Sequence, residues 1–177
     1  MAFPFKNITA NVTLRLAEVT DAPFIFSLRN NPHLNQHLSP VSGGIEQQEQ
    51  WLKEYKLREA KGREFYFILV DRNGDPVGTT RVYDIHDKDC EVGSSILTET
   101  APPTSAIEGT LNCWDIIFSQ LKLETFHCKV TRGNEKAYRF HEHLGSTETG
   151  RDDQNIYFVV TPAHLERLKK RYRKLVV

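Results

Sequence analysis

The chain has 177 residues, and its 39% hydrophobic content is enough to bury one sizeable core, so we expect a single domain over residues 1–177. The 23 Lys and Arg residues balance the 23 Asp and Glu residues, and the formal net charge is zero. A neutral chain has no global basic field to attract nucleic acid or an acidic membrane, and we expect a small-molecule partner instead.

The cysteines and the N-terminus indicate the compartment. Cys90, Cys113 and Cys128 are scattered, odd in number and free of any CxxC pair, which predicts neither a disulfide framework nor a zinc site. The first 13 residues lack the apolar stretch of a signal peptide, and no apolar run of about 18 residues appears. We therefore expect a soluble, cytoplasmic protein that holds no metal.

The first quarter of the chain predicts one strand followed by helices. Residues 12–16 alternate apolar and polar side chains as a strand does, and Thr20-Asp21 offers an N-cap for a helix around Ile25. Asn30-Asn31-Pro32 ends that helix. Beyond it we expect three segments in order: a short helix over 33–38, a loop over 39–44 and a long helix over about 45–61.

The middle of the chain predicts an antiparallel sheet. Residues 65–70 and 77–85 are rich in β-formers and flank Asn73-Gly74, a dipeptide that supplies the positive φ angles of a tight hairpin. A second turn over 86–89 leads into a third strand over 91–97. The prolines at 102 and 103 end this sheet.

The remainder predicts helices alternating with strands, and the whole order is α+β. Ser105 and Glu108 match a capping box for an amphipathic helix over 105–120. Four further segments follow: a buried strand over 126–130, a helix over 135–144 stopped by Gly145, a strand over 155–160 and a basic helix over 162–177.

Several motifs resemble those of the GNAT superfamily of acetyl-CoA-dependent acyltransferases. They are Leu28-Arg29-Asn30-Asn31-Pro32, Pro76-Val77-Gly78, Cys90-Glu91-Val92-Gly93, and Asn134-Glu135-Lys136-Ala137 ahead of Leu144-Gly145. The opening segment, Val12-Thr13-Leu14-Arg15 with Asp21 and residues 28–32, is similar to that of the branch that holds ribosomal-protein and amino-sugar N-acetyltransferases. Within the superfamily the chain resembles enzymes that acetylate a nucleotide-linked 4-amino-sugar, a likeness carried by Arg29-Asn30-Asn31-Pro32 through Asn35-Gln36. The resemblance implies a GNAT fold with a mixed, mostly antiparallel twisted sheet of six to seven strands flanked by helices.

The resemblance also implies an acetyl-CoA site. Backbone groups of Ser95, Ile96 and Leu97 would pair with pantetheine as an added strand does. The start of the next helix, at Thr104, Ser105 and Ala106, would bind the pyrophosphate through free N–H groups and the helix dipole. Asn134 and Ala137 would contact the cofactor arm, although Asn134 is equally suited to cap its own helix.

Two features, at three positions, depart from the pattern of the family. Pro102 and Pro103 stand where the family places glycines, and proline has no N–H group to offer to phosphate, which predicts a degenerate pyrophosphate loop. His141 stands seven residues after Asn134, where the family usually has a tyrosine that protonates the departing thiolate. Either His141 or Tyr138, one helical turn earlier, would then be the acid.

The remaining roles concern the base and the acceptor. Glu91 is the candidate base for the amine proton, unless it is an ordinary solvated strand residue. By the resemblance, Arg29, Arg81 and Tyr83 flank the acceptor pocket, and a guanidinium suits a nucleotide diphosphate, although surface ion pairs would also explain them. The terminal helix could attract RNA, but its mixture of leucines and charges is typical of a docked surface helix.

The sequence therefore predicts an N-acetyltransferase acting on a primary amine, with a nucleotide-linked amino-sugar as the preferred acceptor. A protein N-terminal acetyltransferase is the alternative enzyme, and a GNAT-like binding or regulatory module without catalysis is the alternative from another class. The length of the acyl group and the oligomeric state, with a homodimer among the alternatives, stay open.

Overall fold

The computed structural model describes residues 4–37 and 42–177, and its centre is a seven-stranded sheet in the order β1-β2-β3-β4-β5-β7-β6. The strands are β1 (Val12–Leu16), β2 (Phe65–Asp71), β3 (Pro76–His86), β4 (Asp89–Leu97), β5 (Thr125–Thr131), β6 (Thr147–Arg151) and β7 (Asn155–Val160). Neighbouring strands are antiparallel except β4 and β5, which run parallel. The predicted mixed, mostly antiparallel α+β fold is confirmed.

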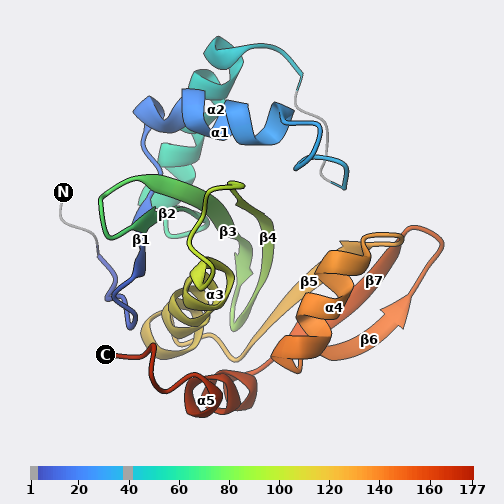
Figure 1. Cartoon of the computed structure of the whole chain (residues 1–177). Helices are drawn as coiled ribbons and strands as arrows, with labels where there is room; N and C mark the ends of the chain where they lie inside the picture. The colour runs from blue at the N-terminus through green and yellow to red at the C-terminus, as the bar shows by residue number, and fades with distance from the viewer. Residues whose placement is uncertain (1–3, 38–41) are drawn as a thin grey trace.

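Helices cover both faces of the sheet (Figure 1). They are α1 (Ala22–Asn30), α2 (Ile45–Ala60), α3 (Ser105–Asp115), α4 (Glu135–Leu144) and α5 (Pro162–Arg171). Side chains of β2 enter two separate cores in alternation, as the period of a strand requires. Phe65 and Phe67 join the core that contains α3, whereas Tyr66 and Ile68 join the core that contains α1 and α2.

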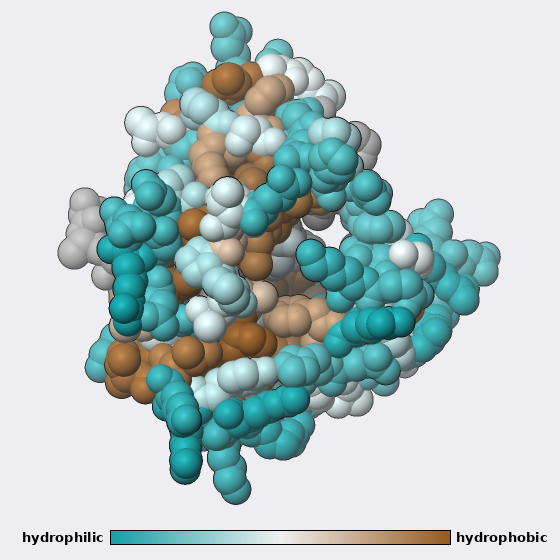
Figure 2. Space-filling model, viewed as in Figure 1, coloured by the Kyte–Doolittle hydropathy of each residue, from teal (hydrophilic) through white to brown (hydrophobic). Residues whose placement is uncertain are grey.

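The sheet opens between its two parallel strands. β4 pairs with β5 at only three positions, from Asp89 opposite Thr125 to Glu91 opposite His127. Beyond Glu91 the two strands separate, so that β5, β6, β7 and α4 project away from the rest of the sheet (Figure 1). Figure 2 shows the surface hollowed between these two parts, with apolar residues inside the hollow.

The hairpin between β2 and β3 forms where the sequence predicts it. Gly74 has a φ of 88°, which a residue without a Cβ adopts readily. Asn73 does not share this conformation, and its N–H instead donates to the Asp71 carboxylate. The turn therefore depends on one glycine and one acidic side chain.

The predicted short helix over 33–38 is wrong for the residues described. Residues 32–34 and 36–37 form turns, and Leu38 lies outside the described residues. The Asn31 side chain accepts a hydrogen bond from the His33 N–H, a local contact that competes with helical pairing. The predicted loop over 39–44 lies partly outside the described residues.

The predicted capping box of α3 is wrong. Thr104 is the N-cap and makes no side-chain capping bond, while Ser105 is already in the helix. The Glu108 carboxylate turns away from the helix end and accepts hydrogen bonds from Asn11 and from the Val12 N–H. These long-range bonds satisfy Glu108, which is fully buried, better than a local cap would.

Two boundaries and one strand also differ from the predictions. The helix expected over 105–120 ends at Asp115 and continues as a π-helical turn over Ile116–Gln120. The terminal helix ends at Arg171, and Val176 then pairs with Thr9. Strand β6 was not predicted, because all five of its residues are exposed.

Among the described residues, no helix has the length and apolar character needed to cross a bilayer.

Candidate functional site

The open edge of β4 is the first element of the site. Beyond Glu91 the side of β4 that faces β5 has no strand partner, so its backbone groups can pair with an extended ligand. Within this edge the register against β3 shifts by one residue, between Gly93 opposite Arg81 and Ile96 opposite Thr79. Ser94 has a φ of 53° at this bulge. Bulges bend a strand and redirect its groups, and this one lies on the cleft edge.

The predicted pantetheine residues lie on this edge. Ser95, Ile96 and Leu97 follow the bulge and end β4, with Ile96 buried and Ser95 exposed. The Ser95 hydroxyl is 3.0 Å from the hydroxyl of Thr80 on β3. This contact anchors the exposed side chain beside the unpaired strand edge.

The start of α3 lies at the end of β4 and offers a reduced anion site. The Ser105 N–H donates to the Pro102 carbonyl at 2.9 Å, so it is used within the turn. The next two N–H groups, of Ala106 and Ile107, belong to the first helical turn, where i−4 pairing gives no partner. The Ser105 hydroxyl is buried and, in the part of the chain that the structure describes, has no hydrogen-bond partner.

Glu91 lies where the cleft is narrowest. It is the last residue of β4 that pairs with β5, and across the other edge of β4 it stands opposite Tyr83 on β3. Burial, followed by the charge of Glu91 and a hydrogen bond to its carboxylate, raises the pKa of Tyr83 to about 12. The structure thus brings Glu91 and Tyr83 together.

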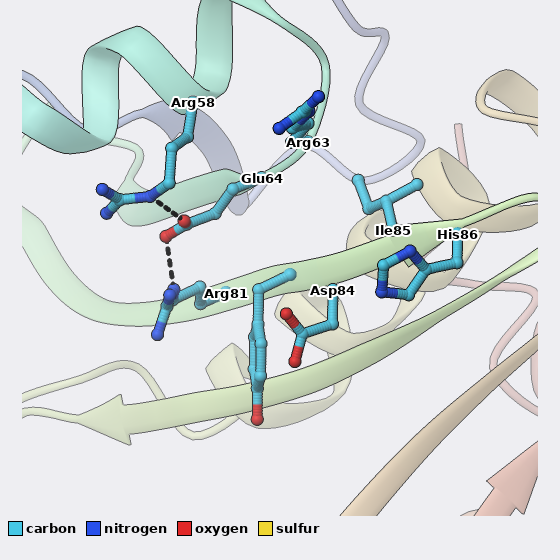
Figure 3. A pocket seen from close by; sticks show the side chains of 8 residues that line it. Arg58, Arg63, Glu64, Arg81, Asp84, Ile85 and His86 are labelled. Carbon is cyan, nitrogen blue, oxygen red and sulfur yellow. Dashed lines mark hydrogen bonds and ion pairs between the residues drawn. The ribbon is translucent and has the colours of Figure 1, made fainter.

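Arg81 and Tyr83 line a pocket of about 480 Å³, and Figure 3 shows Arg81 in it beside Glu64. The remaining lining residues are Arg58, Arg63, Glu64, Asp84, Ile85 and His86. Glu64 is 3% exposed and accepts hydrogen bonds from the Nε atoms of Arg58 at 2.6 Å and Arg81 at 2.5 Å. Both guanidinium groups also lie about 5 Å from the Trp51 ring, at 5.1 and 5.2 Å. The pocket therefore contains ordered guanidinium groups.

Arg29, the third predicted acceptor residue, lies on α1 outside this pocket. Its charge acts on the hydroxyl of Tyr66, a buried residue of β2 whose pKa is raised by burial despite that charge. Tyr66 stands opposite Arg81 in the sheet. Arg29 therefore does not line the pocket, and it is connected to Arg81 only by way of Tyr66.

Asn134 caps α4, as the sequence allowed. Its side-chain oxygen accepts a hydrogen bond from the Ala137 N–H at 3.1 Å. The helix ends at Gly145, whose φ of 74° is the left-handed conformation expected of a C-terminal glycine. The two ends of α4 are therefore fixed by local chemistry, and contact of Asn134 and Ala137 with a cofactor stays a prediction.

His141 is sequestered against the sheet. Its ring stacks on Phe158 with centroids 4.7 Å apart, and its Nδ1 is 3.2 Å from the Ser146 hydroxyl. The Cys128 sulfur is 3.8 Å from the ring nitrogens. Burial lowers the pKa of His141 to about 4, so the imidazole is neutral near pH 7.

Tyr138 points toward the edge strand β6. Its hydroxyl is 3.3 Å from a Glu148 carboxylate oxygen and accepts a hydrogen bond from Arg151 at 3.1 Å. The Arg151 guanidinium also lies 5.4 Å from the centre of the Tyr138 ring. The two acid candidates therefore occupy different surroundings, His141 partly buried against Phe158 and Tyr138 among exposed charges.

Sequence reasoning missed the residues that order the pocket. Glu64 and Trp51 each join two arginines that are distant in sequence, and no local pattern indicates such a contact. Cys128, which burial gives a pKa of about 12, is inert as a thiol but packs against His141. The described residues include no group of three or more His, Cys, Asp or Glu side chains that could hold a metal ion.

The fold, a sheet that opens between two parallel strands with a helix after the first of them, is shared with a known protein family. The chain matches the family model described as acetyltransferase (GNAT) domain over residues 11–147. The protein belongs to the GNAT acetyltransferase family. No curated protein sequence matches the chain.

Solved structures share the fold over most or nearly all of the chain. A structure described as apo FdhC, a nucleotide-linked sugar GNAT, has 36% sequence identity and a TM-score of 0.90, covering 98% of this chain and 99% of that one. Spermidine N-acetyltransferase from Vibrio cholerae, in complex with CoA and spermine, has 20% identity, a TM-score of 0.75 and coverage of 88% and 98%. Ribosomal-protein-S5-alanine acetyltransferase from Vibrio fischeri has 21% identity, a TM-score of 0.75 and coverage of 91% and 96%. The last two show a common fold.

Proposed function

We propose that this protein is an acetyl-CoA-dependent N-acetyltransferase that acts on the primary amine of a nucleotide-linked amino-sugar. The observation that carries the proposal is the 36% identity, over 98% of the chain, to a protein described as a nucleotide-linked sugar GNAT. The ordered arginines of the pocket support it, because guanidinium groups bind the phosphates of a nucleotide well. The three arginines of the pocket outnumber its two carboxylates, Glu64 and Asp84, so the pocket suits an anionic group better than a polycationic acceptor such as a polyamine.

The residues of the cleft fit coenzyme A in part. The unpaired edge of β4 suits the pantetheine arm, whose amides hydrogen-bond as a strand does. At the pyrophosphate position Pro102 and Pro103 have no N–H group to donate, and we propose that the N–H groups of Ala106 and Ile107 are the donors instead. We expect binding to be retained through these two N–H groups and through the strand edge.

Bound acetyl-CoA would supply the acetyl thioester. Glu91, at the narrow end of the cleft, takes a proton from the acceptor amine, directly or through a water molecule, and so frees the nitrogen lone pair for attack on the acetyl carbonyl. Backbone N–H groups near the bulge at Ser94 lie on the same edge and suit stabilisation of a developing oxyanion. His141 or Tyr138 returns a proton to the sulfur as the C–N bond forms and the C–S bond breaks.

The acid assignment depends on protonation. His141 is neutral near pH 7 because of its burial, so the imidazolium form is scarce in the free protein. Tyr138 ordinarily keeps its proton at this pH, but its hydroxyl is engaged by Glu148 and Arg151. Measurements of kcat across a range of pH for His141→Phe and Tyr138→Phe decide between them. The variant that lacks the acid should show a kcat about 100-fold below that of the wild type.

The experiment that tests the proposal measures thiol release from acetyl-CoA with a panel of amines. The panel contains nucleotide-linked amino-sugars, the same sugars without the nucleotide, peptides with a free N-terminal alanine, and spermidine. The proposal predicts the highest kcat/KM for a nucleotide-linked sugar. Preference for the peptide would instead support a protein N-terminal acetyltransferase. Calorimetric binding of acetyl-CoA without turnover on any amine would support a binding or regulatory module.

A further inference from the structure

Tyr83 and Glu91 form a cross-strand pair at the narrow end of the cleft. They stand directly opposite each other on the antiparallel strands β3 and β4. Side chains in this relation have Cβ atoms roughly 5 Å apart, close enough for a tyrosine and a carboxylate to interact. The pair places a hydroxyl donor beside the candidate base.

Gly93 leaves room for the Tyr83 ring. A Cβ atom built at Gly93 would lie 3.2 Å from the Tyr83 hydroxyl oxygen and 3.3 Å from its Cε1. The ring of Tyr83 therefore lies over the backbone of β4, two residues beyond Glu91. Any larger residue at this position would have to displace the ring.

Arg81 also contacts the Tyr83 ring. Its guanidinium lies 4.5 Å from the centre of the Tyr83 ring, a cation–π contact. The same guanidinium donates through Nε to Glu64, a nearly fully buried carboxylate, as Figure 3 shows. The Arg81 guanidinium is thus held by Glu64, and its position limits the orientation of the Tyr83 ring.

We infer that Tyr83 is a positioning residue that holds the Glu91 carboxylate in place for proton removal, with Gly93 and Arg81 setting the direction of its hydroxyl. The inference rests on the proposed function, in which Glu91 is the base. It gives Tyr83 a different role from the substrate contact that the sequence suggests. A substrate-binding residue affects the affinity for the acceptor, whereas a residue that orients the base affects turnover.

Steady-state kinetics separate these two roles. In Tyr83→Phe we expect kcat to fall about tenfold, since a hydrogen bond to a charged group is worth at least that factor, while KM for the acceptor stays within about twofold of the wild-type value. Gly93→Ala should reproduce this effect by displacing the ring. Gly150→Ala is the matched control, because a Cβ at Gly150 meets no atom within 4 Å. A raised acceptor KM at unchanged kcat in Tyr83→Phe would overturn the inference.

A second measurement does not depend on turnover. The ultraviolet difference spectrum between the wild type and Tyr83→Phe isolates the ionisation of Tyr83 at alkaline pH. Introducing Glu91→Gln into both proteins should move this ionisation to lower pH, because the charge of Glu91 contributes to the raised pKa of Tyr83. No movement means that the two side chains do not interact, and the inference fails. Movement in a protein that acetylates no amine would instead contradict the proposed function alone.

Discussion

Replacement of His141 by phenylalanine should make the stability of the protein less sensitive to acid. Burial lowers the pKa of His141 to about 4 from an ordinary value of 6.5. In that interval the unfolded chain binds a proton that the folded protein does not, so stability falls as the pH drops from about 7.5 to 4. At about 1.4 kcal/mol per pKa unit, the loss due to His141 is at most about 3 kcal/mol. Phenylalanine keeps the stacking on Phe158 and removes the titration.

The assay is urea denaturation of the wild type and the variant at pH 7.5, 6.0, 5.0 and 4.0. His33→Phe is the control, because His33 is an exposed histidine in a turn. We expect the loss of stability in acid to be smaller by up to about 3 kcal/mol in His141→Phe than in the wild type, and unchanged in the control. A difference below about 1 kcal/mol between His141→Phe and the wild type would refute the reasoning.

Two further predictions concern α3, and urea denaturation at pH 7.5 checks both. Gly109→Ala should destabilise the fold by about 1–2 kcal/mol, because the added Cβ would lie 2.6 Å from a methyl carbon of Leu69. This overpacking outweighs the gain in helix propensity. Equal stability of this variant and Gly150→Ala would contradict the packing argument. Glu108→Ala should cost about 3 kcal/mol, because the backbone and side-chain donors of the N-terminal segment lose their buried acceptor. The exposed Glu135→Ala provides the comparison, and a similar cost for both variants would show that the buried network contributes little.

The segment from β5 to the end of α4 could be predicted in detail because its signals are local. Asn134 at the helix start and Gly145 at its end both act within a few residues, and the structure shows the N-cap bond and the left-handed glycine. The alternation of buried and exposed residues in β5 likewise follows from the strand period. The family could be inferred from such local motifs, and the comparisons confirm it.

Features that depend on distant contacts could not be predicted. Ser105 and Glu108 have the spacing of a capping box, but Glu108 bonds to a segment about 97 residues earlier in the chain. Strand β6 has no apolar alternation, because it is an exposed edge strand paired only with β7. The bulge at Ser94 likewise has no local sequence signal, and neither do the ion pairs of Glu64 with two arginines.

The predicted site is therefore partly assembled by the structure. Glu91, Tyr83 and Arg81 lie together, and the β4 edge and the start of α3 lie along one cleft. Arg29 is connected to this group only through Tyr66, and Tyr138 points to β6. The direction of each side chain decides whether a predicted residue joins the site. That direction depends on packing, which the spacing of residues in the sequence does not determine.

The central claim is that Glu91 removes the acceptor proton in an acetyl transfer from acetyl-CoA. The most direct test compares wild type and Glu91→Gln in two quantities, kcat for thiol release with a nucleotide-linked amino-sugar and the calorimetric Kd for acetyl-CoA. We predict that kcat falls by about 100-fold or more while the Kd changes by less than about twofold. Unchanged kcat in the variant, or no binding of acetyl-CoA to the wild type at millimolar concentration, would contradict the account.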